Sequence, residues 1–79
     1  MDSNPSPIIS LFAANLRRHR RSQGLSQERL AALAGLDRTY VSSCERGLRN
    51  VTIETLAGLG QALSIPPNTL IEEGALHES

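Results

Sequence analysis

The stretch SQERLAALAGLDRTYVSSCER, residues 26–46, predicts two short helices joined by a tight turn. Ser26 and Asp37 are residue types that favour helix N-caps, because their side-chain oxygens can accept from free backbone N–H groups. Gly35 lies between the two helices, where the backbone needs a left-handed conformation. We therefore expect helices over about 27–34 and 38–46.

The second of these helices has two distinct faces. Val41 and Cys44 point to one side, which suits packing against a core. The other side is polar and spans roughly 140° at 100° per residue. Its members are Arg38, Thr39, Ser42, Ser43 and Arg46. Small hydroxyl residues let a helix enter a DNA major groove roughly 12 Å wide, where arginine can pair with guanine or phosphate.

Four residues beside this face are further candidates for DNA contact. Gln27 lies in the first helical turn, where free N–H groups suit a phosphate. Tyr40 could contact a phosphate or a thymine methyl, and it serves equally well at the edge of the core. Arg49 and Asn50 fall in the following loop, from which they could reach bases or backbone. The alternative for Arg49 is a solvated loop charge.

An apolar residue followed by a cap position recurs along the chain and predicts further helix starts. The instances are Leu25-Ser26, Leu36-Asp37, Val51-Thr52 and Ile65-Pro66. With an earlier amphipathic stretch, they predict five helices, at about 8–23, 27–34, 38–46, 53–63 and 67–73. Gly60 would allow close helix contact. Residues 1–7 are expected to be a disordered leader and residues 74–79 a frayed tail, so one all-α domain covers 8–73.

Charge is strongly polarised although the chain has no net charge. All eight basic residues are arginines between Arg17 and Arg49, and only three acids share that segment. The segment therefore carries a formal charge of +5, and the remainder carries −5. This distribution favours one phosphate-binding pole and one pole that avoids DNA.

Other classes of protein find little support. No apolar run approaches the roughly 18 residues of a membrane span, and the N-terminus lacks a charged signal region. Cys44 is the single cysteine, so no internal disulfide can form, and a cytoplasmic location is the default expectation. His19 lies on an apolar stripe and is expected to be packed. We find no spacing typical of metal ligands, cofactor loops or catalytic groups, and predict no enzyme.

The motif and its flanks resemble a known family. The matching residues are Gln27, Leu30, Ala31, Ala34, Gly35, Leu36, Val41 and Cys44, with Leu16-Arg17, Arg20 and residues 24–28 before them and residues 45–47 after. They are similar to XRE-type regulators of the Cro/cI repressor class over roughly residues 11–71. The resemblance implies an all-α, five-helix lambda-repressor-like DNA-binding domain, and an ion pair between Arg20 and Glu45.

A narrower similarity lies in DRTYVS at residues 37–42, followed by ERG at 45–47 and Arg49-Asn50. It resembles the controller proteins of restriction–modification systems, although other XRE regulators, including phage-type repressors, share this string. Two residues depart from the pattern. Cys44 replaces a larger aliphatic residue, and Pro66 replaces a Ser or Thr cap.

The resemblance implies a homodimer on a pseudo-palindromic double-stranded operator, since each recognition helix covers one half-site. Apolar residues away from the arginine pole are the expected dimer interface, namely Ile65, Leu70, Ile71 and Leu76. The resemblance also allows two further partners: a second dimer on an adjacent site, and RNA polymerase. The alternative is an antitoxin-like protein-interaction module, which the neutral total charge would suit.

Overall fold

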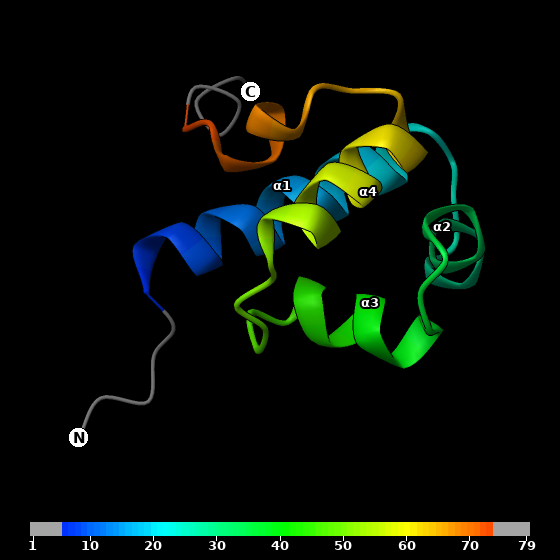
Figure 1. Ribbon diagram of the computed structural model, residues 1–79, viewed down its shortest axis with the longest axis horizontal. Coiled ribbons are helices and arrows are strands. Elements are labelled where there is room, and N and C mark those ends of the chain that lie inside the picture. Colours follow the sequence, from blue (N-terminus) through cyan, green and yellow to red (C-terminus); the bar gives the residue numbers. More distant parts are fainter. Residues whose placement is uncertain (1–5, 74–79) are drawn as a thin grey trace.

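The computed structural model describes residues 6–73, and all regular structure in this part of the chain is helical (Figure 1). Four α-helices are followed by one 3₁₀ helix. Their bounds are α1 Pro7–Ser22, α2 Gln27–Ala34, α3 Arg38–Glu45, α4 Ile53–Leu63 and η1 Pro67–Ile71. The predicted all-α class is confirmed, and the predicted limits of the second and fourth helices match the structure.

The fifth helix differs from the prediction of an α-helix over 67–73. It is a five-residue 3₁₀ helix that ends at Ile71. Pro66 and Pro67 both lack a backbone N–H, and the chain turns instead through a bond from Thr69 N to Pro66 O at 3.0 Å. The prediction of five α-helices is therefore corrected to four α-helices and a 3₁₀ turn.

The first helix begins earlier than expected. Ser6 is its N-cap, and its Oγ accepts from Ile9 N at 3.3 Å. Pro7 occupies the first helical position, where its fixed φ and missing N–H carry no cost. The predicted leader over 1–7 is thus wrong at Ser6 and Pro7, while residues 1–5 and 74–79 lie outside the described part.

The Ser and Thr caps of α2 and α4 follow the sequence pattern, whereas Asp37 and Pro66 make no side-chain capping bond. Ser26 Oγ accepts from Arg29 N at 2.9 Å, and Thr52 Oγ1 accepts from Thr55 N at 3.0 Å. Asp37 occupies the N-cap position of α3, but its carboxylate makes no capping hydrogen bond. Its charge still lies beside the positive end of the α3 dipole. Gly35 takes the left-handed conformation, with φ of 69°.

Apolar residues from every helix form one core. Its buried members are Phe12, Leu16, Leu30, Ala31, Val41, Cys44, Leu59, Leu63 and Leu70. Helix α2 packs against α3 and α4, η1 packs against α1 and α4, and α3 also contacts α1. This arrangement leaves α3 at one side of the molecule (Figure 1).

The 3₁₀ helix is tied to α1 by a buried amide. Asn15 Nδ2 donates to Leu70 O at 3.1 Å and to Glu72 O at 3.0 Å. Gly60 gives the chain room to approach, because a Cβ there would lie 2.9 Å from Ile65 O. The close neighbour of Gly60 is therefore the backbone leading into η1, rather than another α-helix.

Candidate nucleic-acid interface

Helix α3 presents a polar surface at its two ends. Arg38 and Thr39 are exposed in its first turn, and Arg46 is exposed at its C-cap. Ser42 is half-buried between them. Val41 and Cys44 are fully buried, as the two-faced pattern predicts. The outward face therefore contains four of the five residues assigned to it from the sequence.

Ser43 is the exception, and its assignment to the outward face is wrong. The residue is only 7% exposed, and its Oγ donates to Tyr40 O at 2.7 Å. The chain after α3 turns back toward this side: Gly47 takes a left-handed conformation, with φ of 76°, and Leu48 N donates to Ser43 O at 3.0 Å. Helical periodicity alone does not show where a following loop will pass.

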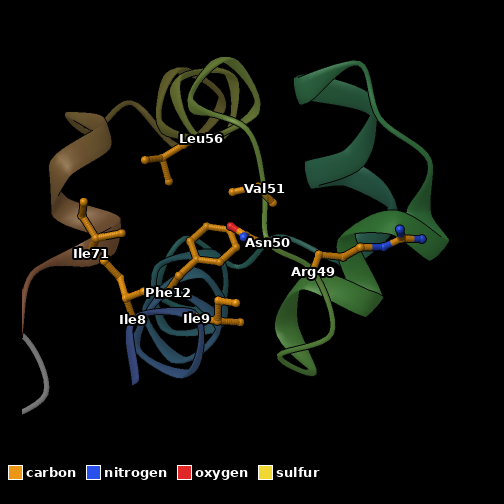
Figure 2. Close-up of a pocket in the computed structure, with 8 residues that line it drawn as sticks. All are labelled: Ile8, Ile9, Phe12, Arg49, Asn50, Val51, Leu56 and Ile71. Atoms are coloured by element: carbon orange, nitrogen blue, oxygen red, sulfur yellow. The ribbon is translucent and has the colours of Figure 1, made fainter. Parts of the chain in front are cut away.

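The same loop carries Arg49 and Asn50, and both are exposed. Arg49 Nε donates to Ser43 Oγ at 3.0 Å, and its Cζ lies 5.0 Å from the centroid of the Tyr40 ring. Tyr40 itself is half-buried against the core. Figure 2 shows the Arg49 side chain extending away from the neighbouring apolar residues and across α3. Arg49, Ser43 and Tyr40 thus form one contact cluster.

Gln27 has a structural partner that sequence reasoning missed. Its Nε2 donates to Glu45 Oε1 at 3.0 Å, so the side-chain amide is engaged inside the protein. The backbone N–H groups of the first α2 turn remain the local feature suited to a phosphate. An acid and an amide 18 positions apart give no local signal of such a contact.

Glu45 also forms the ion pair implied by the resemblance. Arg20 Nε donates to Oε2 at 2.6 Å and Arg20 Nη2 donates to Oε1 at 3.0 Å. The Glu45 side chain is fully buried and that of Arg20 is 11% exposed. Arg20 Nη1 further donates to Leu25 O at 2.8 Å. The pair joins α1 to the end of α3, beside the start of α2.

These contacts stabilise the charged form of both side chains, so the two pKa values move apart. Burial by itself would raise the pKa of Glu45, but hydrogen bonds from Arg20 and Gln27 and the nearby arginine charges outweigh it and lower that pKa. The hydrogen bond to Glu45 raises the pKa of Arg20 despite burial. Arg17 adds a second tie, because its Nη2 donates to Glu45 O at 3.1 Å.

Cys44 and His19 are residue types that can act in catalysis or metal binding, and both are at least partly buried in this protein. Burial raises the pKa of the Cys44 thiol to about 11, which disfavours the nucleophilic thiolate. His19 is half-buried, and burial together with the charge of Arg18 lowers its pKa. Among residues 6–73, no three acids, histidines or cysteines gather into a metal-binding group.

The residues assigned to a dimer interface lie in different environments. Leu70 is completely buried in the monomer core, so its assignment to an exposed interface is wrong. Packing of η1 onto α1 and α4 covers it. Ile65 and Ile71 are half-buried, and Leu76 lies outside the described residues.

Large apolar side chains elsewhere are open to solvent. Ile53 is 84% exposed and Ile8 is 55% exposed. A shallow pocket lies nearby, where α1, α4, η1 and the loop after α3 meet (Figure 2). Its apolar lining is Ile8, Ile9, Phe12, Val51, Leu56 and Ile71.

Across residues 6–73, none of the helices combines the length and apolar character needed to cross a bilayer.

Comparison with known proteins assigns the family. A family model described as helix-turn-helix matches residues 16–70. Control protein C.SmaI of Serratia marcescens is 44% identical over 72 residues, covering 90% of this chain and 86% of its own.

Solved structures give the same assignment. The restriction–modification controller protein C.AhdI of Aeromonas hydrophila is 48% identical, with a TM-score of 0.77 over 78% of this chain and 94% of its own. A tetramer of controller protein C.Esp1396I was solved with its natural 35-base-pair operator. Its chain is 34% identical, with a TM-score of 0.77 over 82% of this chain and 86% of its own. The chain therefore belongs to the XRE-type helix-turn-helix family, whose members are DNA-binding transcriptional regulators rather than enzymes, and its relatives include restriction–modification controller proteins.

Proposed function

We propose that this protein is a sequence-specific regulator that binds a pseudo-palindromic operator as a homodimer and controls a restriction–modification system. The observation that carries the proposal is the exposed polar face of α3. Arg38 and Arg46 lie at its two ends, and the loop residue Arg49 lies beside it. This face belongs to the segment that holds every basic residue of a chain with no net charge.

The proposal divides the work among the residues of this face. Arg38 and Thr39 lie at the N-terminal end of α3, the end that usually meets base edges when a recognition helix enters the major groove. Arg46 suits a phosphate because it is exposed at the other end. Tyr40 adjoins the same surface through Arg49, whereas Asn50 lines the neighbouring pocket. The Gln27 side chain donates to Glu45, so a phosphate at that place would meet the backbone N–H groups of the first α2 turn. Phosphate contacts set the register, and base contacts determine the sequence preference.

The controller role is an extension from the relatives. The C.Esp1396I tetramer with its operator supports the idea that two dimers occupy adjacent sites. The matched relatives are similar along most of their own length, so the comparison is between whole domains. Contact with RNA polymerase is part of the proposal only for activation, because repression can follow from occupying the promoter alone.

We propose the exposed Ile53, rather than the buried Leu70, as a member of the dimer interface, with Ile8 as a second exposed candidate. Ile53 begins α4, directly after the loop that carries Arg49. A two-fold partner at this place would bring two such loops together, and a dimer that reads two half-sites must direct both α3 faces to one DNA duplex. Burying exposed isoleucines also stabilises a domain too small to bury much of its own surface.

Selection from a randomised duplex library, followed by fluorescence anisotropy on the selected duplex, tests the DNA-binding function. We expect log K to fall steeply with log salt, at about −0.9 per phosphate neutralised. Arg21→Ala on α1 is a charge-matched control for Arg38→Ala, and only the latter should weaken sequence preference. Absence of duplex binding at low salt would refute the function and leave the protein-interaction alternative.

A further inference from the structure

We propose that Ser43 and Tyr40 are positioning residues that hold the Arg49 guanidinium, before DNA binds, in the orientation that recognises a guanine. This inference rests on the proposed DNA-binding function. It gives a role to Ser43, which the structure removes from the exposed face, and to the ring of Tyr40.

Two contacts hold Arg49 from different directions. Its Nε donates to Ser43 Oγ at 3.0 Å, and its Cζ lies 5.0 Å from the Tyr40 ring centroid. The hydrogen bond restrains the inner edge of the guanidinium, and the ring attracts its positive charge. An exposed loop arginine that is merely solvated needs neither contact.

The hydroxyl of Ser43 can act only as an acceptor toward Arg49. Its single proton is committed to Tyr40 O, at 2.7 Å, which leaves oxygen lone pairs for Arg49 Nε. The carbonyl of Ser43 accepts from Leu48 N at 3.0 Å, so the same residue also holds the loop that carries Arg49. Ser43 is 7% exposed, so its side of these contacts is largely covered by protein, while the outer part of Arg49 is open to solvent.

The arrangement determines which part of Arg49 is available. Within residues 6–73, Arg49 Nε is the only atom of its guanidinium that makes a hydrogen bond. The Nη1 and Nη2 end remains as a planar pair of donors. Guanine presents two acceptors, O6 and N7, to such a pair in the major groove, whereas adenine presents one acceptor and one donor. Guanine is therefore the base that this arginine is expected to recognise.

Holding the side chain in advance removes part of the ordering cost of binding. Immobilising one long side chain typically weakens association by about 2- to 10-fold. We expect Ser43→Ala to lose an amount in this range on the selected duplex while its affinity for random duplex is unchanged. Ser43→Thr keeps the hydroxyl and should restore the selected affinity.

Replacing single guanines of the selected duplex by 7-deazaguanine tests the contact at one atom, because this base lacks only the N7 acceptor. We expect one guanine in each half-site at which the change weakens wild-type binding about tenfold. Inosine keeps O6 and N7 and should bind normally at that position. Arg49→Ala should be insensitive to both bases there.

The positioning role predicts coupling with that guanine. The losses from Ser43→Ala and from 7-deazaguanine should not add, because a loosened Arg49 has less of the N7 bond to lose. Tyr40→Phe keeps the ring and should retain the tenfold penalty, whereas Tyr40→Leu should reduce it. Additive losses, or equal penalties in Phe and Leu variants, would overturn the proposal. If Ser43→Ala does not fold, the Tyr40 pair decides.

Nuclear magnetic resonance of the free protein gives a second readout. The Nε–H bond vector of Arg49 should have a high order parameter in the wild type and a low one in Ser43→Ala and Tyr40→Leu. A mobile Nε–H in the wild type overturns the proposal even if Arg49 contacts DNA. Failure of the library to yield any preferred sequence would instead refute the DNA-binding function itself.

Discussion

Arg20 and Glu45 form a two-point ion pair, in which Nε and Nη2 of the guanidinium reach separate carboxylate oxygens at 2.6 and 3.0 Å. Gln27 donates to one of these oxygens as well, at 3.0 Å. The three residues come from α1, α2 and α3. The carboxylate therefore fixes the end of α3 relative to both preceding helices, and the exposed face of α3 depends on it.

Removal of this carboxylate should destabilise the fold strongly. Glu45→Ala leaves the Arg20 charge in a largely buried position without its partner, which typically costs about 3–5 kcal/mol. For a domain of this size the melting temperature should fall by more than about 10 °C. Thermal unfolding followed by circular dichroism measures it. Glu28→Gln removes an exposed acid and should shift the midpoint little; equal midpoints in both variants would contradict a buried role.

Stability should depend on pH through the same group. The pKa of Glu45 is lower in the folded protein, so between the folded and unfolded values the unfolded chain binds more protons. The contribution is complete above the ordinary glutamate value near 4.3 and is lost as pH falls through the lower folded value. Urea unfolding across this range should show the loss, and Glu45→Gln should flatten that part of the profile.

Arg38 should contribute to sequence preference at the N-terminal end of α3. Arg38→Ala is expected to lose about 1–3 kcal/mol of discrimination between the selected duplex and one with the contacted base pair changed. Its affinity for random duplex should change much less. A uniform loss on every duplex, with a salt slope reduced by about one, would show that Arg38 contacts a phosphate instead.

Ile53 and Leu70 should separate dimerisation from folding. Ile53→Asp changes a residue that is 84% exposed, and the new acid lies at the favourable N-terminus of α4, so the monomer should keep its stability. Sedimentation should show a dissociated dimer. Leu70→Ala opens the core and should cost about 2–5 kcal/mol. An unchanged sedimentation profile for Ile53→Asp would place the interface elsewhere.

Two glycines of α4 provide a matched pair. A Cβ at Gly60 would lie 2.9 Å from Ile65 O and 3.1 Å from Pro67 Cα, both backbone atoms, whereas a Cβ at Gly58 has no such neighbour within 4 Å. Gly60→Ala should destabilise by about 1–3 kcal/mol. Gly58→Ala should be neutral or stabilise by up to about 1 kcal/mol. Denaturant unfolding measures the free energy of unfolding of both variants. Similar values would mean that the backbone before η1 shifts at no cost to make room for the Cβ at position 60.

Most features that the sequence predicts correctly depend on residues that are close together in the chain. The bounds of α2 and α4 and the caps at Ser26 and Thr52 are set by contacts within a few residues. The buried side of α3 is also visible, because Val41 and Cys44 recur at helical spacing. The 3₁₀ form of η1 does not follow from Pro66 in the sequence, since the form of a short helix depends on the elements that cover it.

The sequence by itself determined the helices, the arginine-rich segment and the family, because caps, periodicity and residue identity are properties of neighbouring positions. Tertiary structure decided which polar residues remain outside. The loop after α3 buries Ser43 and places Arg49 on Tyr40, and the packing of η1 turns Leu70 from a surface candidate into core. Helical periodicity does not show where the loop after α3 passes, although that loop is close to Ser43 in the chain. The packing of η1 joins segments far apart in the chain, and only the assembled core fixes that placement.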